Sequence, residues 1–499
     1  MESKPKRTAY AFQNDNEAAL KNHDIMSKFT KIVATISDKR CDTEFIRDLY
    51  AAGLNVVRMN SAHLSYEGFE KIVRNTRAAS ESLAVMMDTK GPEIRTTVTV
   101  DGEKIHFTTG DRVRVVGNPE GETSHEEICL SYPKIAQVLE PGNRILIDDG
   151  EVGFRVISVR GDVVEAEAEN DGELGSRKSV NLPGVSVDLP AVTERDRTNI
   201  GYAAKLGVDF IAHSFVRSAV DVREVQDILS SYGANTKIIS KIENQEGIDN
   251  FDEILEASYG IMVARGDLGI EVPAEKIPGI QAMMINKCIT AHKPVIVATQ
   301  MLHTMIEHPR PTRAEVSDVA NAVYQRADAM MLSGETAYGK YPVEAVKVMT
   351  SVAIEVEAAQ RKVLDVPPLR DGAIRSFLSH EAVMSQNILG TKAILTDAYK
   401  GMSARYIASF RGNIPTFAIC HNPSVLRWLA LSYGVTAYAS QQQGLHANRH
   451  SVEAVRRIVA DGHLAYDDRF AYLTGTRRGP RALEILTPVE IFEEAAGQE

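Results

Sequence analysis

From residue 29 onward, short runs of β-branched and other apolar residues alternate with amphipathic stretches of helix length. The helix-length stretches include residues 43–52, 218–232 and 276–292. The apolar runs span residues 31–36, 55–59, 84–88, 208–214, 237–241, 260–264, 294–298 and 329–332. Such alternation is typical of parallel βα units, because a strand that is covered on both faces is apolar along its length. Eight units predict an α/β fold built on a closed (β/α)₈ TIM barrel.

One interval interrupts this alternation, and a second alternation follows it. Hairpin-like runs separated by Gly-, Asp- and Asn-rich turns occupy residues 104–109, 112–116, 144–148, 154–159 and 163–169. After a helix at residues 342–360 and a polar passage at 362–371, strands are expected at residues 393–397, 416–420, 435–440, 470–474 and 483–486. We predict an N-terminal arm (1–28), the barrel (29–92 and 182–360), an inserted β-barrel lid domain (93–181) and a C-terminal open α/β domain (361–499).

Composition narrows the classes of function. The chain carries 56 Lys and Arg residues against 67 Asp and Glu residues, a formal net charge of −11. This balance argues against nucleic-acid and anionic-membrane binding, which need a basic face, although a local pocket can still be positive. The four cysteines lack disulfide or zinc spacing, no apolar signal segment opens the chain, and no apolar run reaches the ~18 residues of a membrane span. We expect a cytoplasmic protein.

Polar groups gather where the predicted strands end. The carboxyl ends of barrel strands meet on one rim, which carries the active site in barrels of this kind. Chemically useful side chains follow seven of the eight strands, at Arg58 and Asn60, Asp88 to Lys90, Ser214, Lys241 to Asn244, Arg265 to Asp267, Thr299 and Gln300, and Ser333. One such residue has many structural explanations, so the prediction of an active site depends on their convergence.

Glu243 and Asp267 are the predicted ligands of a divalent metal. Two carboxylates on neighbouring strands leave coordination positions for water and substrate oxygens, which suits Mg²⁺ or Mn²⁺. The alternative for either carboxylate is a structural salt bridge. Lys241 lies two residues before Glu243, where a lysine beside a metal can stabilise a phosphate or an enolate oxygen. A solvated or ion-paired lysine is the alternative.

Arginines, hydroxyls and a glycine complete the predicted rim. Arg58 and Arg95 can bind phosphate or carboxylate bidentately, and Gly266 permits close approach of backbone amides to a carboxylate. Hydroxyl groups, for which helix capping is the alternative role, come from Ser214, Thr299 and Ser333. Residues 334–340 match the phosphate-loop spacing GxxxxGK, but Tyr341 replaces the required Ser or Thr, so we interpret the match as accidental.

Eleven sequence blocks, in order along the chain, resemble successive sequence blocks of pyruvate kinase. The similar blocks are Lys31-Ile-Val-Ala-Thr-Ile, Val57-Arg-Met-Asn60, Met87-Asp-Thr-Lys-Gly-Pro-Glu-Ile-Arg95, Ile147-Asp-Asp-Gly150, Val180-Asn-Leu-Pro-Gly184, Ser214-Phe-Val-Arg217, Lys241-Ile-Glu-Asn244, Ile261-Met-Val-Ala-Arg-Gly-Asp-Leu-Gly269, Ala298-Thr-Gln-Met-Leu302, Pro309 to Asn321 and Met331-Leu-Ser-Gly-Glu-Thr-Ala337. The resemblance is close over residues 29–360 and looser beyond. It implies phosphoryl transfer from phosphoenolpyruvate to ADP, giving pyruvate and ATP in glycolysis, by a homotetramer that needs Mg²⁺ (or Mn²⁺) and K⁺.

The same resemblance implies a role for each site residue. The implied catalytic residues are Lys241, Arg58, Thr299 and Ser333. The implied substrate-binding residues are Arg58, Lys241, Ala264, Arg265, Gly266, Asp267 and Thr299, and the implied nucleotide-binding residues are Asn60, His63, Arg95 and Lys178. Glu243 and Asp267 would hold Mg²⁺. Lys178, from the inserted domain, would close over the nucleotide as part of a lid.

The chain departs from the family pattern at the implied potassium site. The family binds K⁺ through Asn, Ser, Asp and Thr, of which three are matched here by Asn60, Asp88 and Thr89. Ala62 replaces the serine, and the neighbouring Ser61 is expected to point to the opposite side. Glu93 matches the glutamate that accompanies potassium dependence in the family. We therefore predict K⁺ activation, with a carbonyl or a water in place of the missing hydroxyl.

A second departure lies in the C-terminal domain. The family's effector loop Ser-Gly-Arg-Ser-Ala corresponds here to Lys400-Gly-Met-Ser-Ala404. Gly401 and Ser403 can open a helix that binds phosphate, and Arg477 and Arg478 follow in a basic run. We predict a phosphorylated allosteric effector of unknown identity. A solvated basic turn is the alternative.

Two other classes of function remain open at this stage. One is another Mg²⁺-dependent barrel enzyme that acts on phosphoenolpyruvate or pyruvate enolates, such as an aldolase or a mutase. The other is a non-catalytic relative that kept the fold. Lys178 in the inserted domain favours a kinase, because an aldolase needs no nucleotide-facing lid. The non-catalytic alternative conflicts with the joint presence of Lys241, Glu243, Asp267, Thr299 and Arg58.

Overall fold

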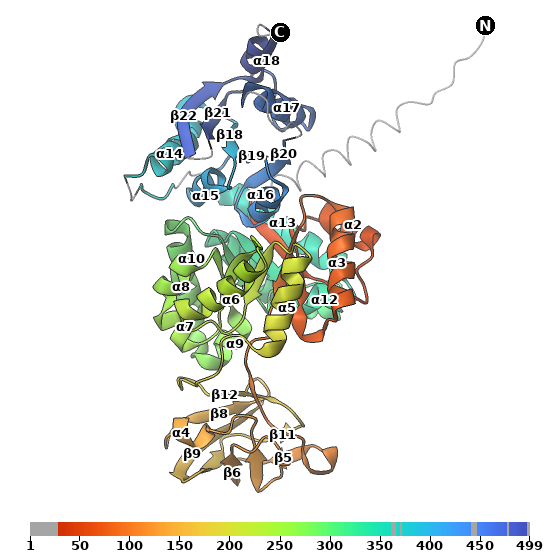
Figure 1. The fold of residues 1–499 in the computed structure, drawn as a ribbon, viewed down its shortest axis with the longest axis vertical. Coiled ribbons are helices and arrows are strands. Elements are labelled where there is room, and N and C mark those ends of the chain that lie inside the picture. Colours follow the sequence, from red (N-terminus) through yellow and green to blue (C-terminus); the bar gives the residue numbers. More distant parts are fainter. Residues whose placement is uncertain (1–27, 361–365, 370–371, 441–446, 477–478, 497–499) are drawn as a thin grey trace, which may run out of the picture.

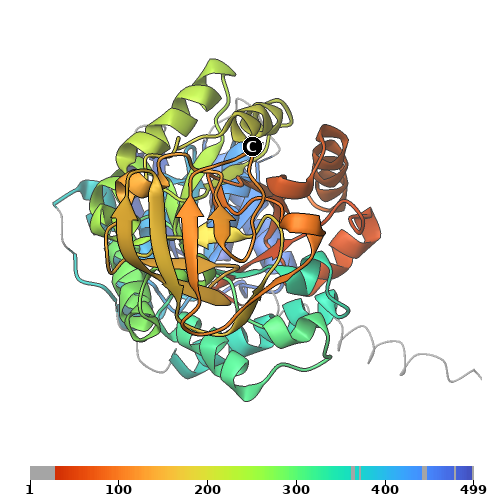
Figure 2. The ribbon, with the colours of Figure 1, turned by 90° about the horizontal axis from the view of Figure 1, so that it is seen from below.

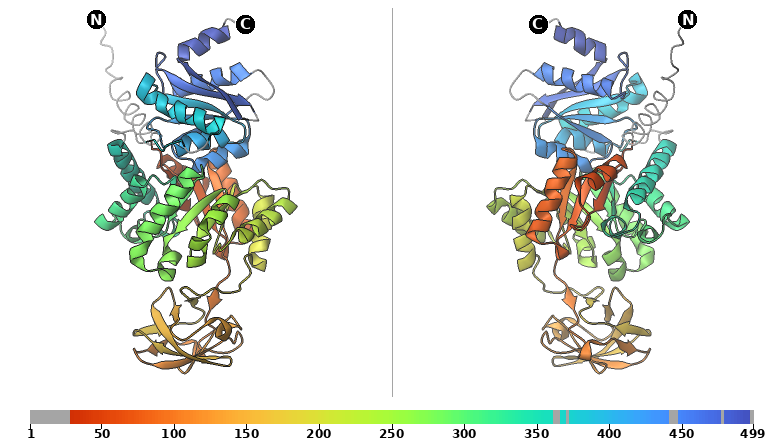
Figure 3. Two further views of the ribbon diagram at one scale, coloured as in Figure 1. Left: turned by 90° about the vertical axis from the view of Figure 1, so that its left-hand side faces the viewer. Right: turned by 90° about the vertical axis from the view of Figure 1, so that its right-hand side faces the viewer.

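The computed structural model describes residues 28–360, 366–369, 372–440, 447–476 and 479–496. Three bodies follow one another along its longest axis (Figure 1): the C-terminal domain, the barrel and the inserted β-sheet. The side views show the inserted sheet joined to the barrel only by narrow chain crossings (Figure 3). The predicted N-terminal arm lies outside the described residues up to position 27. In the part of the chain that the structure describes, no helix is long and apolar enough to cross a membrane.

Eight parallel strands close into a barrel in the order β1-β17-β16-β15-β14-β13-β3-β2. They are β1 (Lys31–Thr35), β2 (Val56–Asn60), β3 (Ala84–Asp88), β13 (Phe210–His213), β14 (Lys237–Ile242), β15 (Gly260–Ala264), β16 (Val295–Ala298) and β17 (Ala329–Leu332). Each strand coincides with an apolar run predicted from the sequence. The (β/α)₈ barrel is therefore confirmed.

The barrel is filled by side chains and closed at one end by another domain. Alternate strand residues such as Val33, Met86, Phe210 and Ile239 point inward and form one buried cluster. Leu431, from the C-terminal domain, belongs to the same cluster. It therefore closes the amino end of the barrel interior, opposite the carboxyl rim that carries the site in barrels of this kind.

Helices surround the strands and bury their inner faces against them. They are α2 (Thr43–Ala51), α3 (Tyr66–Ala79), α5 (Glu194–Lys205), α6 (Ala219–Ser231), α7 (Gln245–Asp249), α8 (Phe251–Ala257), α9 (Arg265–Glu271), α10 (Ile277–Thr290), α11 (Arg313–Tyr324), α12 (Gly334–Ala337) and α13 (Pro342–Gln360), with 3₁₀ turns η1 (Ser61–His63), η3 (Ala274–Lys276) and η4 (His303–Ile306). Several begin at a side-chain cap, and α11 begins with a capping box of Thr312 and Glu315.

The inserted segment leaves after β3 and returns before α5. Its main sheet has the order β4-β12-β8-β9-β10-β6-β7 and lies across the carboxyl end of the barrel (Figure 2). Its elements are β4 (Ile94–Arg95), η2 (Val100–Gly102), β5 (Ile105–Phe107), β6 (Arg112–Val116), β7 (Glu127–Cys129), α4 (Ile135–Val138), β8 (Arg144–Ile147), β9 (Val152–Arg160), β10 (Val163–Ala168), β11 (Gly172–Leu174) and β12 (Ser179–Asn181). Strands β4, β7, β11 and β12 were not predicted, because they are too short to show a period.

The C-terminal domain is an open α/β sheet, as predicted. Its order is β20-β19-β18-β21-β22, parallel except for the pairing of β21 with β22. Its elements are α14 (Ile374–Leu389), β18 (Ala393–Ala398), α15 (Met402–Ser409), β19 (Thr416–Cys420), α16 (Pro423–Trp428), η5 (Leu429–Leu431), β20 (Val435–Ala439), α17 (Ala447–Ala460), β21 (Phe470–Thr476), β22 (Gly479–Leu486) and α18 (Pro488–Ala496).

A buried ion pair joins this domain to the amino end of the barrel. Nη1 and Nη2 of Arg411 donate to Oδ1 and Oδ2 of Asp328 over 3.1 and 2.7 Å. Asp328 also accepts from the backbone amides of Val295 and Tyr433. Since Val295 and Asp328 lie at or just before the first residues of two barrel strands, the pair anchors the domain to the base of the barrel.

Candidate active site

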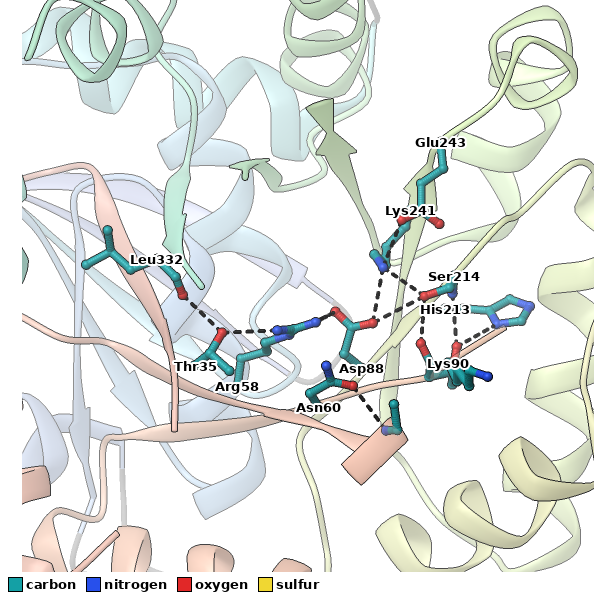
Figure 4. Close-up of polar contacts among 12 residues, drawn as sticks. Thr35, Arg58, Asn60, Asp88, Lys90, His213, Ser214, Lys241, Glu243 and Leu332 are labelled. Atoms are coloured by element: carbon teal, nitrogen blue, oxygen red, sulfur yellow. Dashed lines mark hydrogen bonds and ion pairs between the residues drawn. The ribbon is translucent and has the colours of Figure 1, made fainter. Parts of the chain in front are cut away.

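Asp88 is the centre of a buried polar cluster on the carboxyl rim of the barrel (Figure 4). Its carboxylate, 2% exposed, ends β3 and lies beside Arg58 of β2. Nε and Nη2 of Arg58 donate to Oδ2 of Asp88 over 2.9 and 2.7 Å. The cations at Arg58 and Lys241 hold the pKa of Asp88 below its usual range against the opposing effect of burial. Asp88 is therefore an anion that positions two cations.

Lys241 lies at the meeting point of three neighbouring strand ends. Its Nζ is 2.8 Å from the hydroxyl of Ser214, 3.2 Å from Oδ1 of Asp88 and 2.8 Å from Oε1 of Glu243. Burial alone would lower the pKa of Lys241, but the carboxylates of Asp88, Glu243 and Asp267 outweigh it and raise the pKa. Lys241 is therefore a fixed positive charge at neutral pH.

Glu243 and Asp267 form the acidic wall of the site. Glu243 is 1% exposed, and its Oε2 accepts from the backbone amide of Phe215 over 2.6 Å. Its Oε1 has no hydrogen-bond donor in suitable geometry, although the ammonium of Lys241 lies within ion-pair distance. Burial raises the pKa of Glu243, Lys241 opposes that shift, and the negative charge of Asp267 adds to it. A cation between the two carboxylates would offset both the burial of the Glu243 charge and its repulsion by Asp267.

The charges on this rim fit a divalent metal. Arg58 and Lys241 face three carboxylates, so the cluster lacks positive charge until a cation binds. In the part of the chain that the structure describes, no group of three or more His, Cys, Asp and Glu side chains could hold a metal. A pair of carboxylates that relies on water and substrate oxygens for its other ligands suits Mg²⁺.

A cavity of about 600 Å³ separates this wall from the inserted sheet. From the barrel it is lined by Phe215, Arg217, Glu243, Asn244, Asp267 and Glu271, and from the inserted sheet by Arg95, Asp148, Asp149 and Lys178. The volume is in the range of ligand pockets, and the lining is rich in charged groups. A ligand in this cavity would contact the metal-type carboxylates on one side and the inserted sheet on the other.

The predicted nucleotide-binding cations are ion-paired within the inserted segment. Nζ of Lys178 lies 2.6 Å from Oδ2 of Asp148. Nε of Arg95 donates to Glu93 over 2.6 Å, and its Nη1 donates to a backbone carbonyl over 2.7 Å. Asn60 accepts from the amide of Ala62, two residues away. The side chain of the predicted His63 lies outside the described residues.

The predicted carboxylate cradle lies where β15 runs directly into α9. The amide of Gly266 donates to Oγ1 of Thr299 over 2.7 Å, which joins the ends of β15 and β16. Thr299 has φ +67°, a left-handed conformation that a β-branched residue seldom adopts. The side chain of Arg265 donates to Asp318 over 2.7 Å and to the carbonyl of Thr299 over 2.7 Å, so it is held within the protein at the end of β16.

Ser333 directly follows β17 and is hydrogen-bonded to the helix that begins after it, α12. Its amide donates to Oε2 of Glu335 over 2.7 Å, while Oε1 of Glu335 accepts from the amide of Leu302. Among the described residues, no hydrogen bond joins Ser333 to the cluster around Asp88. Lys340, from the accidental phosphate-loop match, lies 2.5 Å from Glu307 in an exposed ion pair.

The residues predicted to bind K⁺ lie together. Asn60 and Asp88 are partners in the β2–β3 ladder, and Thr89 follows Asp88 directly. The carbonyl and Oγ1 of Thr89 both bind Ser214. Ser61 is fully buried, and its hydroxyl has no hydrogen-bond partner among the described residues.

The predicted effector residues are only partly described. Lys400 is exposed, Gly401 takes φ +73° and Ser403 is 9% exposed at the start of α15. Arg477 and Arg478 lie outside the described residues. Gly401 and Ser403 therefore lie together at the start of α15, next to Lys400.

One rim residue, Thr35, was missed from the sequence, and a second, Ser214, was named without its partners. Oγ1 of Thr35, at the end of β1, accepts from Nη1 of Arg58 over 3.1 Å. Ser214 accepts from Lys241 and donates to the carbonyl of Thr89 over 2.7 Å. The rule that barrel strands end in site residues also applies to Thr35. The role of Ser214 depends on contacts between strands that are distant in sequence.

These features define a class of protein: an α/β barrel whose rim carries two carboxylates that fit a divalent metal, beside a charged lysine and an arginine. Family models described as "Pyruvate kinase, barrel domain" and "Pyruvate kinase, alpha/beta domain" match residues 27–346 and 377–486. Over 471 residues, the chain is 45% identical to the pyruvate kinase of Borreliella burgdorferi, with 93% of this chain and 98% of that protein covered.

A second relative and a solved structure lead to the same family. The pyruvate kinase of Geobacillus stearothermophilus is 40% identical over 492 residues, with 95% of this chain and 82% of that protein covered. The crystal structure of a pyruvate kinase from Cryptosporidium parvum superposes with a TM-score of 0.89 at 35% identity, covering 93% and 97% of the two chains. The chain belongs to the pyruvate kinase family and is an enzyme. An unrelated aldolase or mutase is thereby excluded.

Proposed function

We propose that this enzyme transfers the phosphoryl group of phosphoenolpyruvate to ADP, giving pyruvate and ATP, with Mg²⁺ (or Mn²⁺) and K⁺ as cofactors. The observation that carries the proposal is the position of Lys241, whose ammonium lies between Asp88, Glu243 and Ser214 and is kept charged by the surrounding carboxylates. A fixed cation beside a metal site is what phosphoryl transfer needs, because the reaction depends on positioning and charge more than on a covalent nucleophile.

In the proposed reaction, Lys241 and Arg58 neutralise the phosphoryl group in transit. The P–O bond to the enolate oxygen breaks, and a new P–O bond forms to a terminal oxygen of ADP. Mg²⁺ held by Glu243 and Asp267 would supply positive charge to the phosphoryl and enolate oxygens when bound. Lys241 then stabilises the enolate oxygen until carbon 3 is protonated.

Substrate orientation and proton delivery are assigned to the neighbouring strand ends. The backbone of Ala264, Arg265, Gly266 and Asp267 would bind the substrate carboxylate. The hydroxyl of Thr299, held by the amide of Gly266, would stand beside it. Thr299 and Ser333 would direct the water that gives a proton to carbon 3, which forms the methyl group of pyruvate.

The nucleotide would occupy the cavity between the rim and the inserted sheet. Its phosphates would compete with Asp148 for Lys178 and with Glu93 for Arg95, while Asn60 and His63 approach from the barrel. In the proposed division of the chain, residues 93–181 act as a lid on the barrel of residues 29–92 and 182–360. Closure excludes water and so suppresses hydrolysis of the phosphoryl group.

Potassium, assembly and regulation complete the proposal. Asn60, Asp88 and Thr89 would bind K⁺ with a water or carbonyl in place of the hydroxyl missing at Ala62. Residues 361–499 would regulate a cytoplasmic, glycolytic homotetramer through a phosphorylated effector at Lys400, Gly401 and Ser403. Comparing turnover in sodium-free Tris buffer with and without K⁺ tests the potassium site, and equal rates would contradict it.

A coupled assay tests the main reaction. The protein is supplied with phosphoenolpyruvate, ADP, Mg²⁺ and K⁺, and pyruvate is converted by lactate dehydrogenase with loss of NADH absorbance. We expect pyruvate and ATP in equal amounts, no product without ADP, and no signal above blank for Lys241→Met. Absence of pyruvate from the wild-type protein, or pyruvate formed without ATP, would refute the proposal.

A further inference from the structure

The chain leaves the barrel for the inserted sheet through Lys90 and Gly91. Both backbone amides donate to a single carboxylate, that of Asp196 on α5: Lys90 N to Oδ1 over 2.9 Å and Gly91 N to Oδ2 over 3.1 Å. Asp196 is 1% exposed, and α5 begins where the chain has just returned from the inserted sheet. One carboxylate therefore ties the outgoing chain to the returning chain.

Gly91 packs directly on the rim of the active site. Its φ is +73°, and a Cβ atom there would lie 2.7 Å from the ring of Phe215 and 3.0 Å from Cβ of Ser214. The position therefore needs glycine. The backbone amide of Phe215 donates to Glu243, and the hydroxyl of Ser214 accepts from the ammonium of Lys241. Gly91, where the chain leaves the barrel, therefore packs against the two residues that bind Glu243 and Lys241.

The residue before this exit is anchored to the barrel itself. The amide of Thr89 donates to the carbonyl of Ala212 over 2.9 Å, and its Oγ1 accepts from the amide of Ser214 over 3.0 Å. Residues 89–91 are thus fixed by β13 and by Asp196 together. The crossing segment starts at Pro92 and leads within a few residues to Arg95, which lines the cavity.

We infer that Asp196 is a positioning residue that sets the direction of this crossing segment, and with it the placement of Arg95 and the inserted sheet over the cavity. The inference rests on the proposed function, because it takes the cavity to be the nucleotide site. Binding of the nucleotide then depends on Asp196 through the placement of Arg95 and the inserted sheet. Lys241 and Asp88 depend on it less, because they have anchors of their own in Ser214 and Arg58.

A simpler role for Asp196 is helix capping. Thr193 caps α5 by accepting from the amide of Asp196, and its hydroxyl donates to Oδ2 of Asp196 over 2.7 Å. A cap of this kind needs only one carboxylate oxygen. Oδ2 also accepts from Gly91, whereas Oδ1 accepts from Lys90. The two roles can still be tested separately, because a change at Thr193 leaves both amide donors in place.

The test compares Asp196→Asn with two matched variants. An asparagine has one acceptor oxygen and one NH₂ group, so one of the two backbone amides loses its partner while the shape is kept. Thr193→Val removes the cap and leaves both amide bonds. Glu315→Gln alters a similar clamp elsewhere, in which the carboxylate accepts from the amides of Thr304 and Thr312 over 2.7 Å each.

We expect Asp196→Asn to raise the KM for ADP about tenfold, because a small misplacement of binding groups weakens their contacts with the ligand, and to change the KM for phosphoenolpyruvate less than twofold. Amide hydrogen exchange in the ligand-free protein should quicken at residues 93–95 and 179–189 and stay unchanged in the barrel strands. Glu315→Gln and Thr193→Val should show neither effect. If Asp196→Asn fails to fold, Asp196→Glu should reproduce the KM split, because it keeps both acceptor oxygens but moves them by one methylene group.

Unchanged exchange and unchanged KM for ADP in Asp196→Asn would overturn the inference, as would an equal phenotype in Thr193→Val. The exchange measurement needs no turnover. If the wild-type protein forms no pyruvate, the proposed function fails while the exchange comparison still decides the role of Asp196.

Discussion

The two ends of the barrel are each built around a buried arginine–aspartate pair, yet they differ in what surrounds it. At the base, Arg411 and Asp328 have side chains 1% and 5% exposed. Asp328 also accepts two backbone amides, and Arg411 also donates to the carbonyls of Ala408 and Arg326. The donors and acceptors of the pair are satisfied within the protein, so no ligand can use them.

At the rim, Arg58 and Asp88 form a pair of the same length that remains open to a ligand. Arg58 and Lys241 both bind Asp88, and both keep side chains 12% exposed toward solvent. Lys241 is shared with Glu243, whose Oε1 lacks a proper donor. The comparison teaches that a saturated pair serves stability, whereas a pair with shared, accessible charges is available for binding and chemistry.

The strongest way to break this comparison is to remove the shared cation. Lys241→Met should lower kcat by at least about 10³-fold, because it removes a preorganised charge from the reacting oxygens. Its free energy of unfolding should fall less than that of a base variant, since Asp88 keeps Arg58 and the rim keeps access to water. The coupled assay and urea unfolding measure the two effects. A large loss of stability with activity retained would reverse the assignment of the rim.

The Arg411–Asp328 pair at the base of the barrel should show the opposite result, a large loss of stability with little change in activity. Arg411→Met leaves Asp328 buried without its cation, which costs about 3–5 kcal/mol of unfolding free energy, while kcat at 25 °C should change less than about threefold because the site lies at the other end of the barrel.

Unfolding of this interface can be followed with a built-in probe. The chain has a single tryptophan, Trp428, whose carbonyl accepts from Tyr259 and whose ring is covered by Lys237 at the base of the barrel. Arg58→Met is the matched control at the rim. It should lose activity while it loses less stability than Arg411→Met. Equal losses of stability in the two variants would remove the distinction between the two ends.

The sequence predicted the strands and the rim for a physical reason. A barrel strand is buried on both faces, so its run of apolar residues is unbroken, and its last residue marks the rim. This rule located Arg58, Asp88, Lys241 and Thr299. It could not show which charges are paired, because Arg411–Asp328 and Asp196–Gly91 join residues far apart in the chain. Lys178 came from the family resemblance alone, which implied that it faces the nucleotide and did not indicate its ion pair with Asp148.

Backbone strain offers a sharper comparison of the two ends. Thr299 and Gln300 both take left-handed φ values, +67° and +54°, directly after a barrel strand. At the base, Arg326 and Arg411 take φ +60° and +52° just after helices, where left-handed residues commonly end a helix. The rim therefore carries strain that no helix end explains.

Thr299→Gly should relieve this strain and remove the hydroxyl. We expect the free energy of unfolding to rise by about 1 kcal/mol and kcat to fall by about 10²-fold if the hydroxyl assists protonation of the enolate. Arg326→Gly is the matched control and should add about the same stability, as glycine does at left-handed positions, without loss of activity. Retained kcat in Thr299→Gly would show that its hydroxyl has no catalytic part.

The smallest expected effect is a pH dependence confined to the base. Lys31 is buried, and its Nζ donates to the carbonyl of Val435 over 2.7 Å. Burial lowers the pKa of Lys31 to about 8, although Glu357 and Asp328 act in the opposite direction. Between that value and the ordinary 10.5, the unfolded chain binds more protons than the folded protein, so the free energy of unfolding should rise with pH.

Lys31→Met should remove this contribution, which amounts to at most about 1.4 kcal/mol per pH unit. Urea unfolding at several values between pH 8 and pH 10, followed through Trp428, should give a shallower slope for Lys31→Met than for the wild-type protein. Lys347→Met, which removes an exposed lysine of α13, should leave the slope unchanged. Because Lys31 lies at the closed end of the barrel, the kcat of Lys31→Met should follow the wild-type pH profile, and a shifted profile would mean that the two ends are coupled.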